Sequence, residues 1–489
     1  MDHLLGCRWN ADCWRNFSWT PRWGARAFLL GLGSSNIAAM PTTSWGYRAA
    51  LRLGTALAPA LGRFDHKIRT GDHARRGAGD RLLEWARWNR DAARPLAWFH
   101  AASVGEGLQA ETVLRHFRQL RPDCQTIYTH FSPSAEALAR RLEVDAADYL
   151  PYDLPDTMHR LLASLEPDLL VFAKLDVWPE LSTRAATSGA QVAIVAATVS
   201  PGSGRLRWPA RRLLESGYQV ITAAAAISPE DADRLAQLGV PAERIQILGD
   251  PRFDSVAERV RAVKPDESLL SFGHGAPTLV AGSTWPAHEA VLLGAFADLH
   301  RRRPDARLIL VPHEPTPAQL EALQRRAASL GLPVPVRLSE AQGPVPLLVV
   351  DRMGLLAALY GSGSMAYVGG GFGAAGLHSV LEPAAWGIPV AFGPRWHNSR
   401  DAALLLEAGA GMALPRSWIG RARAALQQQW ERWIVDEEGR RAQGQRAREV
   451  VERGLGASLR SAEMLAGLIS ARLLRRSPRA ARSAPPSTP

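Results

Sequence analysis

A glutamate at the start of a predicted helix is the first residue that could do chemistry. The run His100-Ala-Ala-Ser103-Val-Gly-Glu106 joins an apolar strand, expected over 97–100, to a helix expected over 108–120. A carboxylate in a first helical turn is kept ionised by the helix dipole and can accept a proton from an attacking hydroxyl. Glutamate in a first turn also serves simply to stabilise its helix, so both interpretations stay open for Glu106.

Two charged residues follow a second apolar strand, expected over 169–173. Lys174 and Asp176 come directly after it, where the carboxyl ends of parallel strands meet ligands. Together with Ser103 they are candidates for acceptor contact and charge balance. A buried ion pair between Lys174 and Asp176 explains the same residues without a ligand and remains the alternative.

Two loops in the second half of the chain suit a phosphate group. The strand expected over 279–281 runs into Gly-Ser-Thr, whose amides and hydroxyls can bind phosphate oxygens. The glycine-rich run 369–376 also follows a strand and allows close approach of the backbone to a phosphate. No lysine follows its glycines, so it fits neither a Walker A loop nor a dinucleotide fingerprint. The candidates for donor binding are Ser283, Thr284, Gly369, Gly370, Gly371, Gly376 and, just before a linker, Arg252.

The elements that position these residues alternate between strand and helix, which predicts parallel βαβ units. In the first half, strands are expected at 97–100, 126–129, 169–173, 191–196 and 223–227. In the second half, they are expected at 279–281, 307–311, 347–350, 365–368 and 389–392. The fold class is therefore α/β, with two Rossmann-like doubly wound domains facing a central cleft and a C-terminal helical stretch.

The expected layout has seven parts. They are a poorly structured leader (1–39), left untranslated if Met40 is the start, an amphipathic helical segment (40–95), a first Rossmann-like domain (96–262), a linker (263–277), a second Rossmann-like domain (278–415), C-terminal helices (416–474) and a disordered tail (475–489).

The composition is that of a basic globular chain. It is 46% hydrophobic and 21% charged, with a net charge of +11, so its surface should attract anions such as phosphates or an acidic membrane face. The basic residues gather near both ends without interleaved aromatic residues, so nucleic acid is not an expected partner. The three cysteines fit neither a disulfide framework nor a zinc site, which indicates a reducing compartment.

Segment 45–64 is the candidate membrane contact. The chain has no run of about 20 apolar residues, so no spanning helix is expected. Apolar and basic residues recur in the segment at roughly helical spacing: Tyr47, Leu51, Leu57 and Leu61 with Arg48, Arg52 and Arg63. This pattern suits a helix lying in an anionic membrane interface, and equally an amphipathic helix docked on the protein. Pro59 predicts a kink or an early stop.

Together these motifs resemble the Kdo (3-deoxy-D-manno-octulosonic acid) transferases of lipopolysaccharide synthesis, over about residues 96–412. The family pattern of His, two small residues and Ser-Val-Gly-Glu is met by residues 100–106. Further family-like features are Ser132-Pro133-Ser134, Tyr149 to Asp153, Trp178-Pro179, Gly249 to Asp254, Gly282-Ser283-Thr284, Asp351 with Met353-Gly354, the glycine run with His378 and Leu381-Glu382-Pro383, and Phe392-Gly393-Pro394 with Asn398.

The resemblance implies a GT-B fold with an N-terminal acceptor domain and a C-terminal nucleotide-sugar donor domain. Glu106 is then the base that deprotonates the acceptor, Glu382 binds the donor's ribose, and His378 belongs to the donor site. The donor substrate would be CMP-Kdo, with no metal or further cofactor. The acceptor would be a phosphorylated glycolipid, a lipid A precursor, met peripherally at the cytoplasmic face of the inner membrane. Transfer would invert the anomeric carbon.

The chain also departs from the family pattern. Many members carry Glu-x-Glu-Leu-Trp-Pro where this chain has Lys174 and Asp176, and Val-Pro-Arg-His where it has Val-Pro-His313-Glu. The family's His-Asn is His378-Ser379 here. Two alternatives therefore stay open: a nucleotide-sugar epimerase of the GT-B type that needs no acceptor, and a non-catalytic paralogue that binds glycolipid or nucleotide.

Overall fold

The structure, a computed structural model, describes residues 41–264, 268–373 and 376–480. The expected leader, 1–39, lies outside them. The compact unit that begins at Thr43 contains both sheets described below.

The first sheet has seven parallel strands in the order β3-β2-β1-β4-β5-β6-β7. Their bounds are β1 Leu96–His100, β2 Gln125–His130, β3 Ala146–Tyr149, β4 Leu169–Ala173, β5 Gln191–Ala197, β6 Ala223–Ala226 and β7 Ile245–Ile247. Strands β1 and β4 are buried along their whole length, which is why they read as continuous apolar runs. The strand order reverses between them, so the residues that follow β1 and β4 meet at the switch point where such sheets bind ligands.

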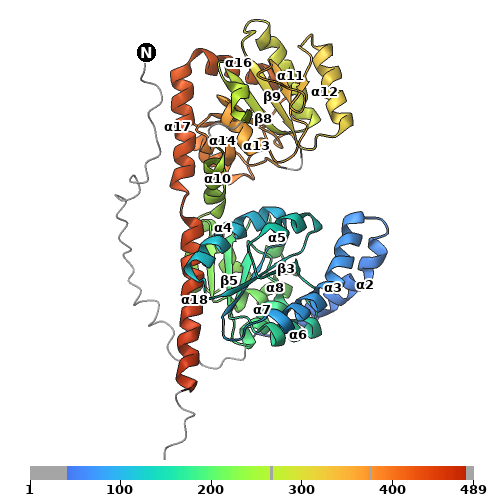
Figure 1. Cartoon of the computed structure of the whole chain (residues 1–489), viewed down its shortest axis with the longest axis vertical. Coiled ribbons are helices and arrows are strands. Elements are labelled where there is room, and N and C mark those ends of the chain that lie inside the picture. Colours follow the sequence, from blue (N-terminus) through green and yellow to red (C-terminus); the bar gives the residue numbers. More distant parts are fainter. Residues whose placement is uncertain (1–40, 265–267, 374–375, 481–489) are drawn as a thin grey trace, which may run out of the picture. The chain divides into compact units, whose positions relative to one another are not determined.

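Helices connect these strands (Figure 1). They are α4 Val104–Leu120, α5 Glu136–Arg141, α6 Pro155–Leu165, α7 Pro179–Thr187, α8 Ala210–Gln219 and α9 Pro229–Leu238. Helix α4 begins four residues earlier than the predicted helix at 108, because Ser103 and Glu106 cap its first turn.

The second sheet also has seven parallel strands, in the order β10-β11-β9-β8-β12-β13-β14. The strands are β8 Thr278–Thr284, β9 Arg307–Pro312, β10 Val336–Arg337, β11 Leu347–Val349, β12 Met365–Val368, β13 Val390–Phe392 and β14 Gly411–Ala413. The helices are α10 Pro251–Ala262, α11 Pro286–His300, α12 Pro317–Ser329, α13 Leu356–Leu359, α14 Leu381–Ala385 and α15 Arg400–Glu407. The central strand β8 lies between β9 and β12, so three strand ends meet beside the glycine-rich run.

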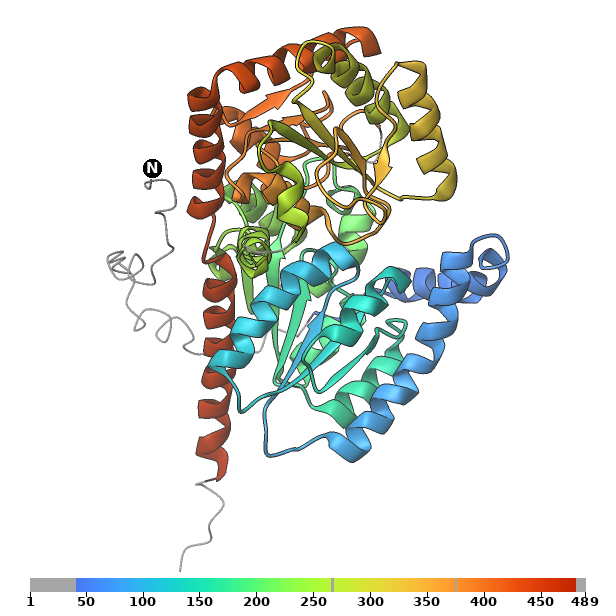
Figure 2. The ribbon, with the colours of Figure 1, turned by 45° about the horizontal axis from the view of Figure 1, so that its top comes forward.

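A helical pair, α2 (Trp45–Leu61) and α3 (His66–Asn89), precedes the first strand; Figures 1 and 2 show it in blue, with α3 running along α6. The first turn of α2 is docked on the protein. Tyr47 donates to Asp153 at 2.8 Å, and Arg48 forms an ion pair with Glu180 at 2.9 Å. The docked-helix alternative therefore holds for this turn.

The rest of α2 presents apolar side chains to solvent. Leu53, Leu57 and Leu61 are 62%, 48% and 52% exposed, and Arg52 and Arg63 are exposed beside them. Pro59 lies inside the last turn, and the helix ends soon after it. Among the described helices, none is long and apolar enough to cross a membrane.

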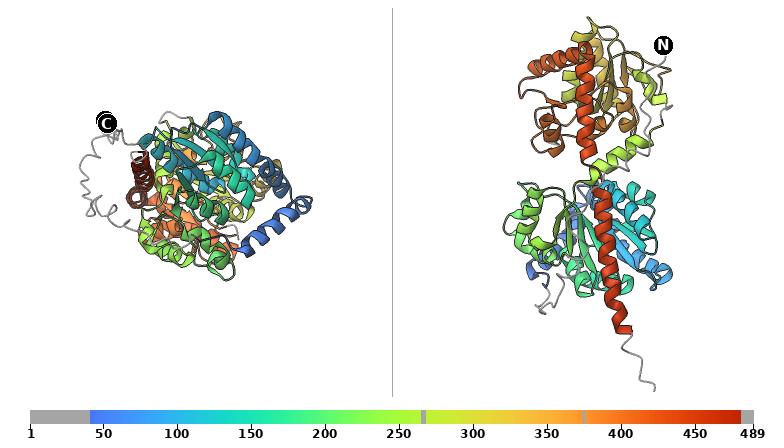
Figure 3. Two further views of the ribbon diagram at one scale, coloured as in Figure 1. Left: turned by 90° about the horizontal axis from the view of Figure 1, so that it is seen from below. Right: turned by 90° about the vertical axis from the view of Figure 1, so that its left-hand side faces the viewer.

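Three helices form the C-terminal stretch: α16 (Ile419–Val435), α17 (Glu437–Arg453) and α18 (Ala457–Ala480). Helix α18 packs against α4 and β5 of the first sheet, as the right-hand view of Figure 3 shows. It places four side chains in the same buried cluster as β1 and α4: Ala462, Leu465, Leu468 and Ile469. The helix extends past Leu474, and residues 481–489 of the expected tail lie outside the described residues.

Candidate active site

Glu106 lies at the carboxyl end of β1, in the first turn of α4. Its Oε2 accepts hydrogen bonds from both the backbone N–H and the hydroxyl of Ser103, each at 3.0 Å. These bonds fix the half-buried carboxylate, and within the described chain its Oε1 takes part in no hydrogen bond. The result is a carboxylate with one oxygen held and the other open, which is the arrangement a general base needs. Its role stays a prediction.

His100, the last residue of β1, joins the residues that follow β4. Its Nε2 accepts from the Trp178 indole at 3.1 Å and lies 3.5 Å from Asp176. Asp176 in turn pairs with Arg205 at 3.0 Å. Burial acts to raise the pKa of Asp176, but its contacts with His100 and the charge of Arg205 outweigh burial and lower that pKa. The two motifs recognised separately in the sequence thus form one network.

Lys174 does not pair with Asp176, contrary to the ion-pair alternative. The ion-pair partner of Asp176 is instead Arg205, which belongs to no motif recognised in the sequence. Lys174 adopts a left-handed backbone conformation (φ 61°), which is strained for a residue with a side chain, and its N–H bonds to Val195. Over the described ranges its ammonium group has no hydrogen-bond or ion-pair partner. A half-buried cation with no carboxylate is a suitable contact for an anionic ligand.

Ser283 and Thr284 end β8 and differ in what their hydroxyls do. Thr284 is fully buried, and its hydroxyl donates to Glu289 at 3.2 Å. The hydroxyl proton of Thr284 is therefore not available to donate to a ligand. Burial raises the pKa of Glu289, against the opposing hydrogen bonds from Gln319 and Thr284. Ser283 is half-buried and left-handed (φ 53°), a strained backbone conformation that Lys174 shares. Ser283 is therefore the better placed of the two for a phosphate contact.

The glycine-rich run is packed backbone against backbone. Gly370 has a φ of 99°, and a Cβ added there would lie 2.0 Å from the Gly376 carbonyl oxygen. A Cβ on Gly371 would lie 2.7 Å from the Cα of Gly393, and one on Gly369 would lie 2.0 Å from the Ser283 carbonyl oxygen. Only glycine fits these positions, so the loop brings amide groups rather than side chains to the strand ends.

Glu382 is the second residue of α14, next to this loop. Its Oε1 accepts from Arg259 of α10 at 2.9 Å. Burial raises the pKa of the Glu382 carboxyl, and the Arg259 guanidinium opposes that rise. Arg259 therefore orients Glu382 and leaves its second oxygen for another hydrogen-bond donor. The ribose role of Glu382 stays a prediction.

Arg252 is bound by two carboxylates. It donates to Asp250 through Nε and Nη2, and to Asp401 through Nη1 and Nη2, at 2.6–3.0 Å. Burial opposes its charge, but Asp401 and Asp250 raise the pKa of Arg252. Most of its donor groups are thus occupied by the protein itself. A donor-binding role for Arg252 stays a prediction.

A cavity of about 800 Å³ opens at the carboxyl ends of β2 and β3. Glu106 also lies at the carboxyl ends of the strands of this sheet. Basic side chains from α3, α5 and the strand ends line it: Arg69, His73, Arg81, His130 and Arg140. Arg81 and Arg140 are paired with Asp148 and Glu136. Arg69 and His73 are one turn apart on α3, exposed, and without a polar side-chain partner among the described residues.

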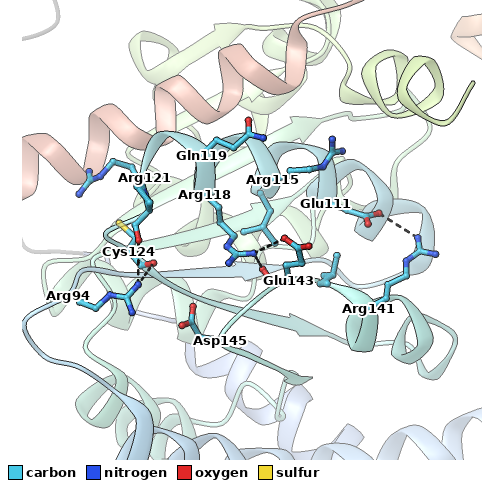
Figure 4. A pocket seen from close by; sticks show the side chains of 13 residues that line it. Arg94, Glu111, Arg115, Arg118, Gln119, Arg121, Cys124, Arg141, Glu143 and Asp145 are labelled. Atoms are coloured by element: carbon cyan, nitrogen blue, oxygen red, sulfur yellow. Dashed lines mark hydrogen bonds and ion pairs between the residues drawn. The ribbon is translucent and has the colours of Figure 1, made fainter. Parts of the chain in front are cut away.

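A second pocket, of about 490 Å³, lies at the opposite end of the sheet, beside the amino end of β2 (Figure 4). Each of its arginines already has a partner. Arg115 pairs with Glu258, Arg118 with Glu143, Arg141 with Glu111 and Arg121 with Asp123, while Arg94 donates to the Asp123 and Cys124 carbonyls. This pocket is a network of ion pairs remote from the strand ends that carry Glu106.

Comparison with known proteins gives a consistent result. A profile of the family described as 3-Deoxy-D-manno-octulosonic-acid transferase (kdotransferase) matches residues 76–255. A 3-deoxy-D-manno-octulosonic acid transferase of Bordetella pertussis is 30% identical over 80% of this chain and 93% of its own length. That of Haemophilus influenzae is 26% identical over 75% of this chain and 86% of its own.

Solved structures support the fold. A UDP-GlcNAc 2-epimerase from Neisseria meningitidis, bound to UDP-GlcNAc, aligns with a TM-score of 0.55 at 12% identity, covering 78% of this chain and all of its own. A putative UDP-N-acetylglucosamine 2-epimerase from Listeria monocytogenes aligns with a TM-score of 0.54 at 10% identity, covering 78% and 97%. At such identities the likeness concerns architecture alone. The predicted GT-B type α/β fold is confirmed.

Proposed function

This chain belongs to the family of 3-deoxy-D-manno-octulosonic acid (Kdo) transferases, and we propose that it moves Kdo from CMP-Kdo to a hydroxyl of a lipid A precursor in lipopolysaccharide synthesis, with inversion. The observation that carries this proposal is the 30% identity to the Bordetella transferase over nearly the whole of that protein. The sequence relatives are named transferases and not epimerases, so the epimerase alternative is not favoured.

Glu106 supplies the base. In a single displacement, the acceptor hydroxyl loses its proton to the open Oε1 while its oxygen bonds to the anomeric carbon of Kdo. The bond from that carbon to the phosphate breaks, and its electron pair leaves with CMP. Ser103 holds Oε2 with two hydrogen bonds, which keeps the carboxylate aimed during the proton transfer.

The donor is held at the ends of β8 and β12. The amides of the glycine-rich run and the Ser283 hydroxyl face the phosphate, and Glu382, oriented by Arg259, accepts from the ribose. Lys174 offsets the negative charge that develops on the leaving CMP. These groups balance the charge without a metal ion.

The acceptor occupies the cavity at the ends of β2 and β3. Its volume suits a sugar headgroup, and its basic wall suits a phosphate. Arg69 and His73 are the basic side chains that remain available there. The cavity shares the carboxyl edge of the first sheet with Glu106, as transfer to a headgroup hydroxyl requires.

Incubation with CMP-Kdo and a lipid A precursor tests the function directly. Mass spectrometry should show one or more Kdo additions to the precursor, and release of CMP should depend on the precursor. Glu106→Gln is the matched blank. Conversion of the nucleotide sugar without any acceptor would favour the epimerase alternative, and no turnover at all would favour a binding protein.

We also propose that α2 holds the enzyme peripherally on the cytoplasmic face of the inner membrane. Exposed leucines alongside Arg52 and Arg63 suit a headgroup boundary, where apolar burial and attraction to anionic lipid add. The acceptor is itself embedded in that surface. Deleting the whole helix would be a poor test, because it would leave the buried Asp153 and Glu180 without Tyr47 and Arg48.

Point substitutions avoid that difficulty. Leu53→Ser, Leu57→Ser and Leu61→Ser combined should lower binding to anionic vesicles by on the order of 10-fold or more, because apolar area no longer enters the lipid. Flotation at low and high salt is the measurement, and salt should weaken the wild type, since the arginine contribution is screened. Val334→Ser, at a still more exposed apolar residue of the second sheet's domain, is the control. Equal flotation of all three proteins would place the membrane contact elsewhere.

A further inference from the structure

Four aromatic rings gather at the ends of β8 and β9 and beside the glycine-rich run. The Trp285 indole stacks on His313 with ring centroids 4.6 Å apart, and the His313 and His378 rings lie 4.7 Å apart. Trp285 also donates to Nε2 of His378 at 3.4 Å. His288, at the start of α11, is buried against the same loop. The strands β9, β8 and β12 are neighbours, so these rings share one strand-end surface.

Among the residues that the structure describes, these imidazoles have no carboxylate partner. The charged groups on the surrounding elements are Glu289 of α11, Glu314 after β9, Glu382 of α14 and Arg395 after β13. Glu289 is bonded to Thr284 and Gln319, and Glu382 to Arg259; across the described ranges none of the four bonds to an imidazole. Burial, and then the neighbouring His313, lower the pKa of His378. Within the described chain, this cluster of basic rings has no anionic partner.

His288 shows the same need for an acceptor. One ring nitrogen faces the Trp285 backbone N–H at 3.1 Å and the other faces the Gly370 N–H at 3.0 Å. Burial lowers the pKa of His288 to about 4, so the ring is neutral near pH 7 and has only one nitrogen that can accept. One of the two backbone N–H groups therefore lies against another N–H. An oxyanion beside the loop would give these donors an acceptor.

We propose that His313 and His378 bind an oxyanion of the nucleotide-sugar donor, and that this binding is coupled to uptake of a proton by the histidine pair. The inference rests on the proposed function, because it takes the anion to be the phosphate or the sugar carboxylate of CMP-Kdo. The proton gives the pair a positive charge beside the anion. It also turns the lone pair of one ring nitrogen into an N–H that donates to the anion.

The sign of the pH dependence follows. An anion beside the pair stabilises the imidazolium and raises its pKa in the complex above that in the free protein. Protons are then bound on complex formation between those two values. Affinity is greatest below the free-protein pKa and falls as the pH rises through the higher pKa of the complex.

Calorimetric titration with CMP in two buffers of different ionisation heat, at about pH 7, measures the uptake. The wild type should take up on the order of 0.3 to 1 proton per CMP bound. His313→Gln and His378→Gln should each lose most of this uptake and bind CMP several-fold more weakly. Because the CMP phosphate titrates near 6 on its own, the difference from the variants is the informative quantity. His159→Gln, at an exposed histidine of α6, is the control and should match the wild type.

His313→Arg distinguishes the effect of a positive charge on CMP binding from the effect of proton uptake. A guanidinium is always protonated and also stacks on indole, so this variant should keep CMP affinity at higher pH and lose the uptake. Uptake with free Kdo but not with CMP would support the site and assign it to the carboxylate. Uptake with cytidine, which has no anion, or uptake unchanged in both glutamine variants, would overturn the inference. Kdo transfer without proton uptake would overturn this inference and leave the proposed function standing. Proton uptake without Kdo transfer would overturn only the proposed function.

Discussion

Glu106→Gln should lower kcat for Kdo transfer by about 100- to 10,000-fold, the range lost when a positioned general base is removed. The glutamine carbonyl can still accept from the Ser103 amide and hydroxyl, so the start of α4 keeps its cap. The melting temperature and the affinity for CMP should therefore stay near those of the wild type. Rapid-quench or steady-state assays with the lipid acceptor give kcat, and calorimetry gives CMP affinity.

A control on the same helix makes this result specific. Glu111→Gln changes a glutamate of α4 that forms an ion pair with Arg141 at 3.5 Å and faces the arginine-lined pocket, away from the strand ends. It should leave kcat within about twofold, as a surface pair contributes little. If Glu106→Gln also stayed within about threefold of the wild type, Glu106 would only stabilise its helix.

Glu382→Ala should raise the KM for CMP-Kdo by about 10- to 100-fold, the value of a hydrogen bond to a charged group. The ribose contact exists in the ground state and the transition state alike, so kcat should change much less. Arg259→Ala should have a smaller effect in the same direction, because it frees Glu382 from the bond that orients it. Kinetics at varied CMP-Kdo and saturating acceptor separate the two constants.

Glu340→Ala, at an exposed glutamate of the same domain, is the matched control and should leave both constants unchanged. A collapse of kcat with an unchanged KM in Glu382→Ala would mean that Glu382 acts on the reacting groups. The ribose assignment would then be wrong.

The central strands could be predicted because strands buried on both faces consist of continuous runs of apolar residues. Leu169–Ala173 and Met365–Val368 are buried on both faces, appear as apolar runs, and match the predicted bounds. The unpredicted strands are the outer ones: β3, β7, β10 and β14. They have two to four residues each, and most of those residues are partly exposed, so no apolar run marks them.

The candidate site shows the same division. Residues that follow buried strands, such as Glu106 and Asp176, could be placed at strand ends from their position alone. Their partners could not. Arg205 and Arg259 come from a connection and a helix with no motif of their own, and ion pairs between sequence-distant residues leave no local pattern. For segment 45–64 the sequence left two alternatives open, a helix docked on the protein and a helix lying in a membrane interface. The first turn of α2 is docked on the protein, and the leucines beyond it are exposed.

The position of α18 has a consequence for how this protein is made. The face of the first sheet beside β1 and α4 is covered by Leu465, Leu468 and Ile469, which the ribosome synthesises after every strand of both sheets. At synthesis rates of about 5 to 20 residues per second, the interval between the end of β7 and these residues is about 10 to 40 seconds. During that time the nascent first domain carries an uncovered apolar face. Premature release of the chain anywhere within that interval would leave a fragment that is enzymatically incomplete and prone to aggregate, and a chaperone that binds such faces would be needed most at this stage.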